Sequence, residues 1–386
     1  MVMARQSLHR RDSQRSADES IFMNSRNGLS ATATAQAQKS SFGIIRWDAW
    51  TTHDGIEKSV VSQVERSLSP ARFHERAPFF ADVTEDGRIV VTEYTKETFD
   101  REMEYAISAH VDYFAYVWYK NVMKTAREFH VQSKYRNDVK MCVCFDANAI
   151  CKSFARKEME TLFLEDYYMK VLGGRPLMYY FGDESRLDMI AEDILYYREL
   201  TAKLGIPEPY AVIMNLSPKQ AKDAHADAVS GYTVGGKDNE PFAAVMERAD
   251  SLWRDWHSSG FPYVPTVSLG WCPEPRFINP VSWINVPENL WAQLPRDDEI
   301  YEHFLYAQSY MAHPSVKNFA EANTFLTYAW NEHDEGGWLC PTIAVDENGN
   351  QLYNSDGSKK LNVGRIEAVG RAIEDFQRGE RRHIEF

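Results

Sequence analysis

The chain has 386 residues, of which 44% are hydrophobic and 26% charged, the composition of a globular protein with a substantial core. Its formal net charge of -13 has the wrong sign for a nucleic acid or an anionic membrane surface, both of which attract basic proteins. No run approaches the ~18 apolar residues of a transmembrane helix, so we expect no membrane span. Aromatic residues make up 13% of the chain, which suits sugar or base stacking as well as a large core.

The first 41 residues differ in composition from the remainder. They are rich in Ser, Ala, Gln and Arg and lack the apolar segment of a secretory signal. We therefore interpret residues 1–41 as a disordered leader or tag and residues 42–386 as a single folded domain. The cysteines are odd in number and include no C-x-x-C pair, which argues against a disulfide framework or a structural zinc site and indicates a reduced, cytoplasmic location.

Eight short apolar runs follow the leader. Each is rich in β-branched or aromatic side chains and is nearly continuous rather than alternating, as in strands buried on both faces of a parallel sheet. The predicted strands are residues 42–47, 111–118, 140–145, 175–181, 210–215, 227–232, 262–271 and 324–330.

Amphipathic segments separate these strands. The predicted helices are residues 95–108, 184–204, 242–257, 301–311 and 362–376. This repeated alternation of strand and helix predicts a (β/α)8 TIM barrel. A doubly wound open sheet is the alternative fold. The chain has no G-x-G-x-x-G or Walker sequence, however, so we expect neither a bound nucleotide nor another cofactor.

Two connections are unusually long, those after the first and the seventh strand. Residues 48–94 contain a predicted hairpin at 83–91, whose Asp86-Gly87 pair is a turn signal. Residues 271–296 are rich in Pro and Trp. Because long loops in compact domains are usually functional or disordered, we expect these two to form ordered rims around a cleft.

In a TIM barrel the residues just past the strand ends line the active site. Here these positions hold carboxylates and aromatic rings, the composition of a sugar site, and two carboxylates can divide the acid and base roles at a glycosidic bond. The candidate catalytic residues are Glu332 and Glu335. The candidate substrate-binding residues are Asp48, Trp118, Tyr119, Asp146, Asp183, Tyr232, Trp271, Arg276, Trp330, Asn331 and His333.

Each candidate also has a purely structural alternative. Helix caps or rim packing are the alternative roles of Asp48, Asp183, Tyr119 and Tyr232. Arg276 could pair with Glu274 on the surface, an interaction of little energetic value. Glu332 and Glu335 could belong to a solvated acidic loop, but the strand before them and the flanking tryptophans favour a site.

Other reaction chemistries find less support in the sequence. His333, Asp334 and Glu335 offer metal ligands, but consecutive residues rarely point at one ion, so we expect no metal. The segment AVSGY (228–232) lacks the first glycine of a serine-hydrolase elbow. Cys340 has no evident base beside it to make it a nucleophile.

The segment WNEHDEG (330–336) resembles the W-N-E-x-x-E-G segment of glycoside hydrolase family 99-like proteins. Further stretches resemble the same family in the same order: IRWDAW (45–50), VDYFAYVWY (111–119), DAVSGYT (227–233) and GWCPEPRFINPVSW (270–283). The family comprises (β/α)8 barrels that include endo-acting α-mannosidases and relatives linked to glycosyltransferases. The resemblance thus implies a glycan substrate and a retaining glycoside hydrolase of carbohydrate metabolism.

The resemblance also implies specific roles. In this family the first Glu acts as a base on the sugar 2-hydroxyl, which attacks C1 to give an anhydro-sugar. The second Glu protonates the leaving oxygen and then activates water. By this resemblance Glu332 is the base, Glu335 the acid/base, and Tyr232 lies near the developing oxocarbenium ion. His333 departs from the pattern, because the mannosidases have an aromatic residue there.

Two other functions remain open. One is a glycosyltransferase or polysaccharide-biosynthesis enzyme on the same barrel. The other is a non-catalytic sugar-binding barrel, which would be favoured if Glu332 or Glu335 were ion-paired and buried away from the cleft.

Overall fold

The computed structural model describes residues 39–51, 59–119, 123–146 and 149–386, all within one compact unit, Ala37–Phe386. A second unit, Met1–Gln36, lies outside the described residues, as does most of the predicted leader. The predicted boundary between a leader and a barrel domain therefore stays a prediction. Among the helices of the described part, none is long and apolar enough to cross a membrane.

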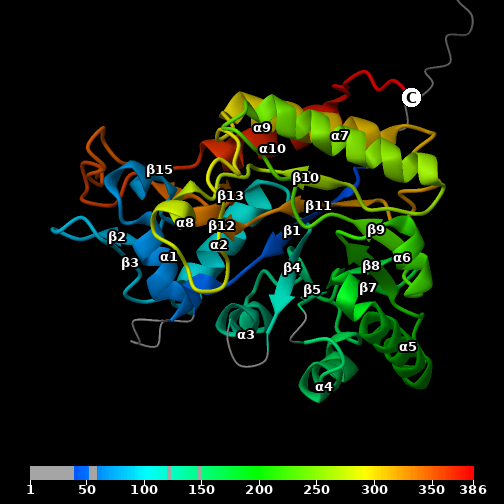
Figure 1. The fold of residues 1–386 in the computed structure, drawn as a ribbon. Coiled ribbons are helices and arrows are strands. Elements are labelled where there is room, and N and C mark those ends of the chain that lie inside the picture. The colour runs from blue at the N-terminus through cyan, green and yellow to red at the C-terminus, as the bar shows by residue number, and fades with distance from the viewer. Residues whose placement is uncertain (1–38, 52–58, 120–122, 147–148) are drawn as a thin grey trace, which may run out of the picture. The chain divides into compact units, whose positions relative to one another are not determined.

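Eight parallel strands form a nearly closed barrel, as predicted (Figure 1). Their order is β10-β11-β1-β4-β5-β7-β8-β9. Between β9 and β10 the Val264 N–H donates to the Val229 carbonyl at 2.8 Å, which links the two edges. The strands are β1 (Ser41–Arg46), β4 (Tyr113–Trp118), β5 (Lys140–Phe145), β7 (Arg175–Phe181), β8 (Tyr210–Met214), β9 (Ala228–Ser230), β10 (Thr266–Ser268) and β11 (Thr324–Tyr328).

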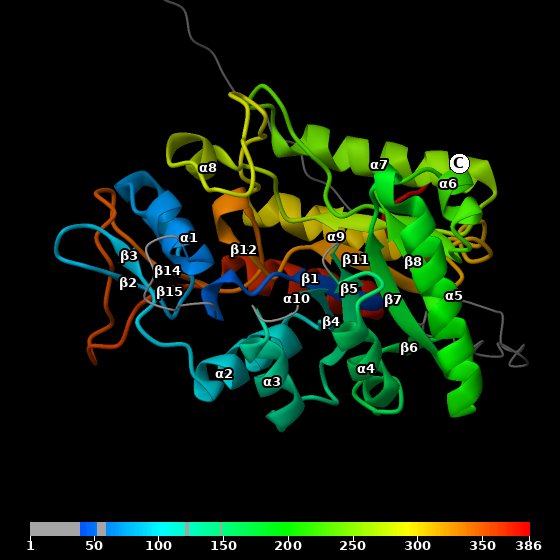
Figure 2. The ribbon, with the colours of Figure 1, turned by 60° about the horizontal axis from the view of Figure 1, so that its bottom comes forward.

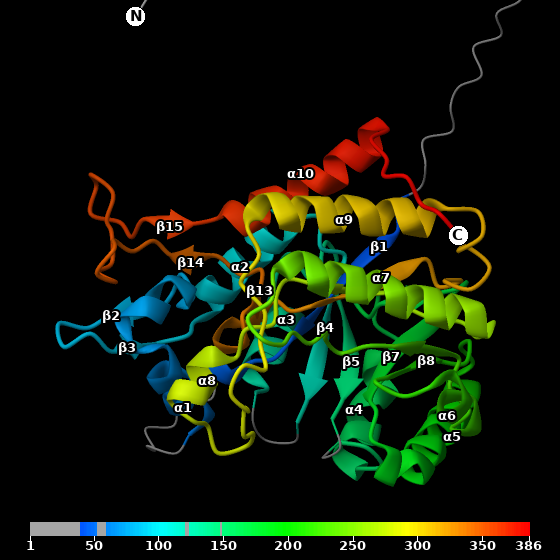
Figure 3. The ribbon, with the colours of Figure 1, turned by 45° about the horizontal axis from the view of Figure 1, so that its top comes forward.

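A helix follows each of these strands and packs outside the barrel (Figure 2). The helices are α2 (Lys96–Ser108), α3 (Thr125–Gln132), α4 (Ser153–Leu162), α5 (Leu187–Leu204), α6 (Pro218–Asp223), α7 (Phe242–Ser259), α9 (Asp297–Ala312) and α10 (Gly364–Arg378). Five of them were predicted. Thr95 caps α2 by accepting from the Thr98 N–H at 3.1 Å, and Gly205 ends α5 in a left-handed conformation. Helices α7, α9 and α10 lie side by side in Figure 3.

Both long connections are ordered over their described residues and contain elements of their own. The first holds α1 (Val60–Leu68), which was not predicted, and the predicted hairpin of β2 (Asp82–Val83) and β3 (Ile89–Val90). The seventh holds the short helix α8 (Glu274–Ile278). These pieces lie at one end of the barrel with the later hairpins β12–β13 (Asn331–Glu332, Gly337–Trp338) and β14–β15 (Thr342–Ile343, Leu361–Asn362) (Figure 1).

Polar side chains fill part of the barrel interior. The Tyr113 hydroxyl lies 2.8 Å from that of Tyr179 and 2.9 Å from the Thr324 hydroxyl, joining β4, β7 and β11 across the axis. Gly43 on β1 faces the Tyr113 ring, where a larger residue would clash. The centre of the barrel is thus packed with side chains, and its chemistry must lie at an end.

Candidate active site

The two predicted catalytic glutamates lie on a tight hairpin just past the end of β11. Glu332 ends β12, and Glu335 ends a single 3-10 turn, His333–Glu335. Gly336 follows with a φ of +82°, and a Cβ there would lie 2.7 Å from the Cys272 backbone nitrogen. The turn therefore needs glycine directly after Glu335. The Cys272 N–H donates to the Glu335 carbonyl at 2.6 Å, which holds this turn against the loop after β10.

Arg276, from α8, binds all three carboxylates of this turn. Its Nε and Nη2 donate to the two oxygens of Asp334 at 2.7 and 2.8 Å, a bidentate pair. Its Nη1 donates to Glu335, and Nη2 also lies 3.3 Å from Glu332 Oε2. The guanidinium is 3% exposed, so the predicted alternative of a surface pair with Glu274 is wrong: Glu274 pairs with Arg72 instead.

Two tyrosines hold the other oxygens of the glutamates. The Tyr232 hydroxyl, past the end of β9, donates to Glu332 at 3.3 Å. The Tyr328 hydroxyl, at the end of β11, donates to Glu335. The two rings lie 5.3 Å apart. Glu332 and Glu335 thus face residues from the mouth of the barrel, not solvent outside it.

Burial dominates the electrostatics of the pair. Glu332 is 3% and Glu335 6% exposed. Burial raises the pKa of Glu332 well above its usual range, and the neighbouring Glu335 adds to the rise while Arg276 opposes it. Burial also raises the pKa of Glu335, again against Arg276. Because three carboxylates share one guanidinium, the pair favours binding a proton, and the two groups titrate together.

Several predicted substrate-binding residues surround this pair. Tyr119 is half-buried and hydrogen-bonds the Trp47 side chain. Burial raises the pKa of Tyr119, and the nearby carboxylates of Asp146 and Glu332 add to the rise. The Trp271 ring lies 6.0 Å from Tyr328. Tyr119, Asp146 and Trp271, together with Tyr232 and Arg276, are the predicted residues that the structure brings near Glu332 and Glu335.

The sequence reasoning missed three residues of this set. The ring centres of Trp47 and Trp283 lie 5.3 and 5.6 Å from the Arg276 guanidinium carbon. Trp283 is 39% exposed and therefore accessible for stacking. Tyr328 was missed because it lies inside a predicted strand. Trp47 was missed for the same reason, because the predicted first strand was residues 42–47, whereas β1 ends at Arg46.

Two predicted residues belong to a second buried cluster, centred on Arg46 of β1. Arg46 donates to Asp48 at 2.6 Å and to Glu102 of α2 at 2.8 Å. The Trp330 indole donates to the same Glu102 at 2.8 Å, and its ring packs 5.2 Å from Phe114. Asp48 and Trp330 are therefore held between β1 and α2. Burial raises the pKa of Asp48 to about 6, against the effect of Arg46.

The remaining predicted residues have structural partners. The Trp118 ring lies under Arg127 of α3 at 3.9 Å, in the helix layer. Asp183 is exposed and caps a 3-10 turn by accepting from the Ser185 N–H at 2.9 Å, its predicted alternative. The Asn331 side chain accepts from the Trp47 N–H at 2.9 Å. None of these contacts tests a role in binding substrate.

His333 begins the 3-10 turn that ends at Glu335 and is fully buried. Its ring packs edge-on to Trp50 at 5.5 Å and stacks on Trp338 at 5.9 Å. Burial lowers its pKa to about 3, so the ring is neutral and serves as an aromatic packing element. His53, another loop histidine, lies outside the described residues. Within the described ranges no three His, Cys, Asp or Glu side chains are grouped as metal ligands.

No protein-family model and no curated protein matches this chain. Among solved structures, the chain is similar to the GH99 endo-alpha-mannosidase from Bacteroides thetaiotaomicron in complex with BIS-TRIS-propane, with a TM-score of 0.54 and 14% identity over 87% of this chain and 97% of that one. A second structure of the GH99 endo-alpha-mannosidase from that organism gives a TM-score of 0.52 and 10% identity over the same shares. At such identities the likeness shows the fold, and it confirms the predicted family resemblance at the level of the barrel.

Proposed function

We propose that this protein is a glycoside hydrolase that cleaves a glycosidic bond in an oligo- or polysaccharide, with Glu332 and Glu335 as its carboxylate pair. The observation that carries this proposal is the arrangement of both carboxylates at the mouth of the barrel, buried, bridged by Arg276 and contacted by Tyr232 and Tyr328. A pair with perturbed pKa values is what acid and base catalysis at a glycosidic bond requires. The fold likeness to a GH99 endo-alpha-mannosidase supports the same class.

The proposed reaction follows the roles that the resemblance implies. Glu332 takes the proton of the sugar 2-hydroxyl as that oxygen bonds to C1, and Glu335 gives its proton to the leaving oxygen as the C1–O bond breaks. Water activated by Glu335 then opens the anhydro ring, and the proton on Glu332 returns to the 2-oxygen. Two inversions at C1 give net retention.

In the unliganded site, the first proton that the two glutamates take up lies on a different carboxyl from the one that the reaction requires. Glu332 lies farther from Arg276 than Glu335 does, and burial raises its pKa well above the usual range. Glu332 is therefore the carboxyl that takes up a shared proton first, whereas a base must be ionised. We propose that the bound sugar moves this proton to Glu335, so that Glu332 is ionised when the 2-hydroxyl reacts.

One observation favours a second candidate function. Both glutamates are ion-paired with a buried arginine, which is one of the two conditions expected of a non-catalytic sugar-binding barrel. The other condition is not met, because the pair faces the mouth of the barrel. A barrel that binds a glycan without turnover is therefore the alternative to test.

The test is a panel of neutral and acidic glycans, assayed for cleavage and for binding by the wild type and by Glu332→Gln and Glu335→Gln. Glu274→Gln is the matched control, because Glu274 lies on α8 with Arg276 but pairs with Arg72 at the surface. Cleavage that both active-site variants lose and the control keeps supports the hydrolase. Binding without cleavage by the wild type would establish the alternative, and cleavage unaffected by either variant would remove the pair from the mechanism. The anomer first released, followed by NMR, reports retention or inversion.

A further inference from the structure

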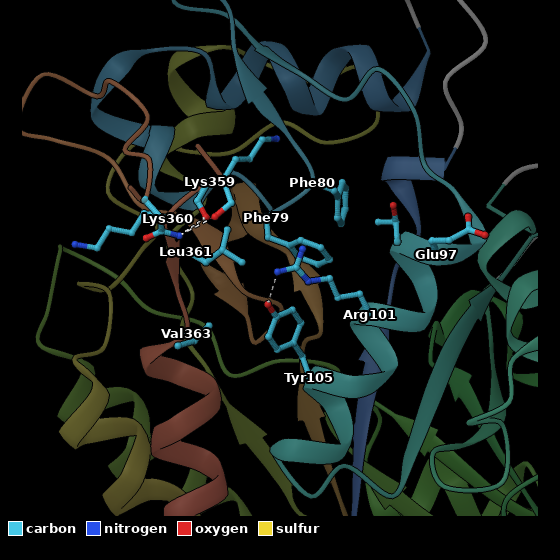
Figure 4. Close-up of a pocket in the computed structure, with 12 residues that line it drawn as sticks. Phe79, Phe80, Glu97, Arg101, Tyr105, Lys359, Lys360, Leu361 and Val363 are labelled. Carbon is cyan, nitrogen blue, oxygen red and sulfur yellow. Dashed lines mark hydrogen bonds between the residues drawn. The ribbon is translucent and has the colours of Figure 1, made fainter. Parts of the chain in front are cut away.

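A pocket between α2 and the β14–β15 hairpin has no part in the proposed reaction. Its volume is about 670 Å³, within the range of small-molecule sites (Figure 4). Helices that follow barrel strands begin at the end where the strands finish, so the first turns of α2 lie at the same end as Glu335. Aromatic contacts connect the two places: Phe80 of the pocket lies 6.3 Å from Trp50, and Trp50 lies 5.5 Å from His333.

The pocket is basic in a chain that is acidic overall. Its charged lining residues are Arg101, Lys359, Lys360 and Glu97. Lys359 is already neutralised by Asp82, 2.7 Å away. Arg101 and Lys360 form no ion pair with any residue that the structure describes, although the whole chain carries a net charge of -13. Figure 4 shows the Lys360 side chain directed away from Arg101, so Arg101 is the cation available to an anion that enters the pocket.

Arg101 is positioned for binding by aromatic rings. Its guanidinium carbon lies 5.2 Å from the Phe79 ring centre and 5.7 Å from that of Tyr105. It donates one hydrogen bond, to the Tyr105 hydroxyl at 3.2 Å, and Figure 4 shows it extending from α2 toward Leu361. Phe79 is itself fixed, because its N–H donates to the Pro341 carbonyl at 2.9 Å. An arginine has five N–H donors, so most of this fork is open to a ligand.

We propose that this pocket is a second glycan-binding site, in which Arg101 holds the carboxylate or sulfate group of an acidic sugar unit and Phe80 packs against the sugar ring. A planar guanidinium matches the two oxygens of a carboxylate, and half-buried Phe80 offers an apolar face beside it. The proposal rests on the proposed function in one respect, that the ligand is a glycan. It implies that the protein acts on an acidic polysaccharide, one stretch of which lies on the rim while another enters the carboxylate pair.

The test measures binding without turnover. Calorimetry on the Glu335→Gln protein, and in parallel on the wild type, uses four probes: tetragalacturonate, a sulfated tetrasaccharide, neutral mannotetraose and sodium sulfate. Arg101→Gln is compared with Arg296→Gln, which removes an exposed arginine that pairs with Asp298 elsewhere. We expect an acidic tetrasaccharide to bind, and Arg101→Gln to weaken it by roughly tenfold to a hundredfold, the usual value of a charge-assisted bidentate contact.

Each outcome decides the proposal. Weaker binding of tetragalacturonate or of the sulfated probe in Arg101→Gln, with Arg296→Gln unchanged, supports it and identifies the acidic group. Equal binding of mannotetraose, binding of free sulfate alone, or no effect of Arg101→Gln overturns it. Because this experiment measures binding alone, its outcome is independent of the glycan-panel cleavage assay. A protein that binds here but cleaves nothing in that assay refutes the proposed function and leaves this site standing.

Discussion

Two buried arginines in this barrel, Arg46 and Arg276, make similar ion pairs but lie in different surroundings. Arg46 and Arg276 are 1% and 3% exposed, and each binds carboxylates that lie directly beside it. Arg46 lies within β1 and faces α2, where Asp48, Glu102 and the Trp330 indole complete a network in the helix layer. Arg276 lies on a loop helix and faces the mouth of the barrel.

The difference lies in charge and in access. The Arg276 cluster has three carboxylates for one guanidinium, and its neighbours Trp271, Tyr119 and Trp283 are partly or well exposed. The Arg46 cluster has two carboxylates and is enclosed by Phe99, Phe114 and Tyr116. A buried ion pair is thus no evidence for function by itself. An excess of carboxylates beside accessible rings is the stronger indication.

The two clusters are separated most sharply by replacing one carboxylate in each with an amide. We expect Glu335→Gln to lower kcat by two to four orders of magnitude, the usual contribution of a general acid or base, with little loss of stability. Glu102→Gln leaves Arg46 with one carboxylate partner instead of two. We therefore expect a lower free energy of unfolding, while the kcat of the folded protein stays near that of the wild type. Steady-state kinetics and urea unfolding on both variants make the comparison. Equal loss of kcat in both would erase the distinction between the clusters.

The structural cluster can be broken at its centre. Arg46→Met leaves Asp48 and Glu102 buried without their cation, and we expect a loss of about 3–5 kcal/mol in the free energy of unfolding. Arg88→Met is the control, because Arg88 pairs with Asp86 in an exposed hairpin and such pairs contribute about 1 kcal/mol or less. Urea midpoints at constant slope give both values. A loss under about 1 kcal/mol in Arg46→Met would show that the network adds nothing to stability.

Asp48 should make stability depend on pH. Its pKa is about 6 in the folded protein and roughly 3.9 in an unfolded chain, so the folded state binds the proton more tightly. Protonated Asp48 therefore makes its full contribution to the free energy of unfolding below about pH 4. Up to about 3 kcal/mol of this contribution is lost as the pH rises through 6. The difference in unfolding free energy between wild type and Asp48→Asn should fall by that amount between pH 4 and 7. Asp86→Asn is the control, since hydrogen bonds from Thr84 and Arg88 lower the Asp86 pKa and give the opposite slope.

The barrel could be predicted because its signals are local. All eight predicted strands are present, since a strand buried on both faces has a continuous apolar sequence wherever it pairs. The longer helices α2, α5, α7, α9 and α10 were also predicted, whereas the short helices α3, α4 and α6 were not, because six to ten residues carry too little periodicity.

The membership of the two clusters was harder to predict. The rule that strand-end residues face the mouth assigned Asp48 and Trp330 to the site, but the chain leaves β11 at Tyr328, and Trp330 turns toward Glu102. Glu102 lies on the buried face of α2, and no sequence signal separates it from the exposed acids of that helix. Arg276 was assigned to the site, yet its pairing with Asp334 depends on how two distant loops pack.

Asp334 gives the smallest test of the proposed catalytic role of the Arg276 cluster, because it acts on the two glutamates only through Arg276 and through its charge. Its charge raises the pKa values of Glu332 and Glu335, and its two bonds hold the Arg276 fork. In Asp334→Asn both carboxyl pKa values should fall, so the acidic limb of the kcat/KM profile should move to lower pH. Glu274→Gln removes the same charge from the surface of α8 and should leave the limb in place. A loss of activity without any movement of the limb would show that Asp334 only supports the fold of the turn, and that Arg276 sets the proton affinity of the pair without it.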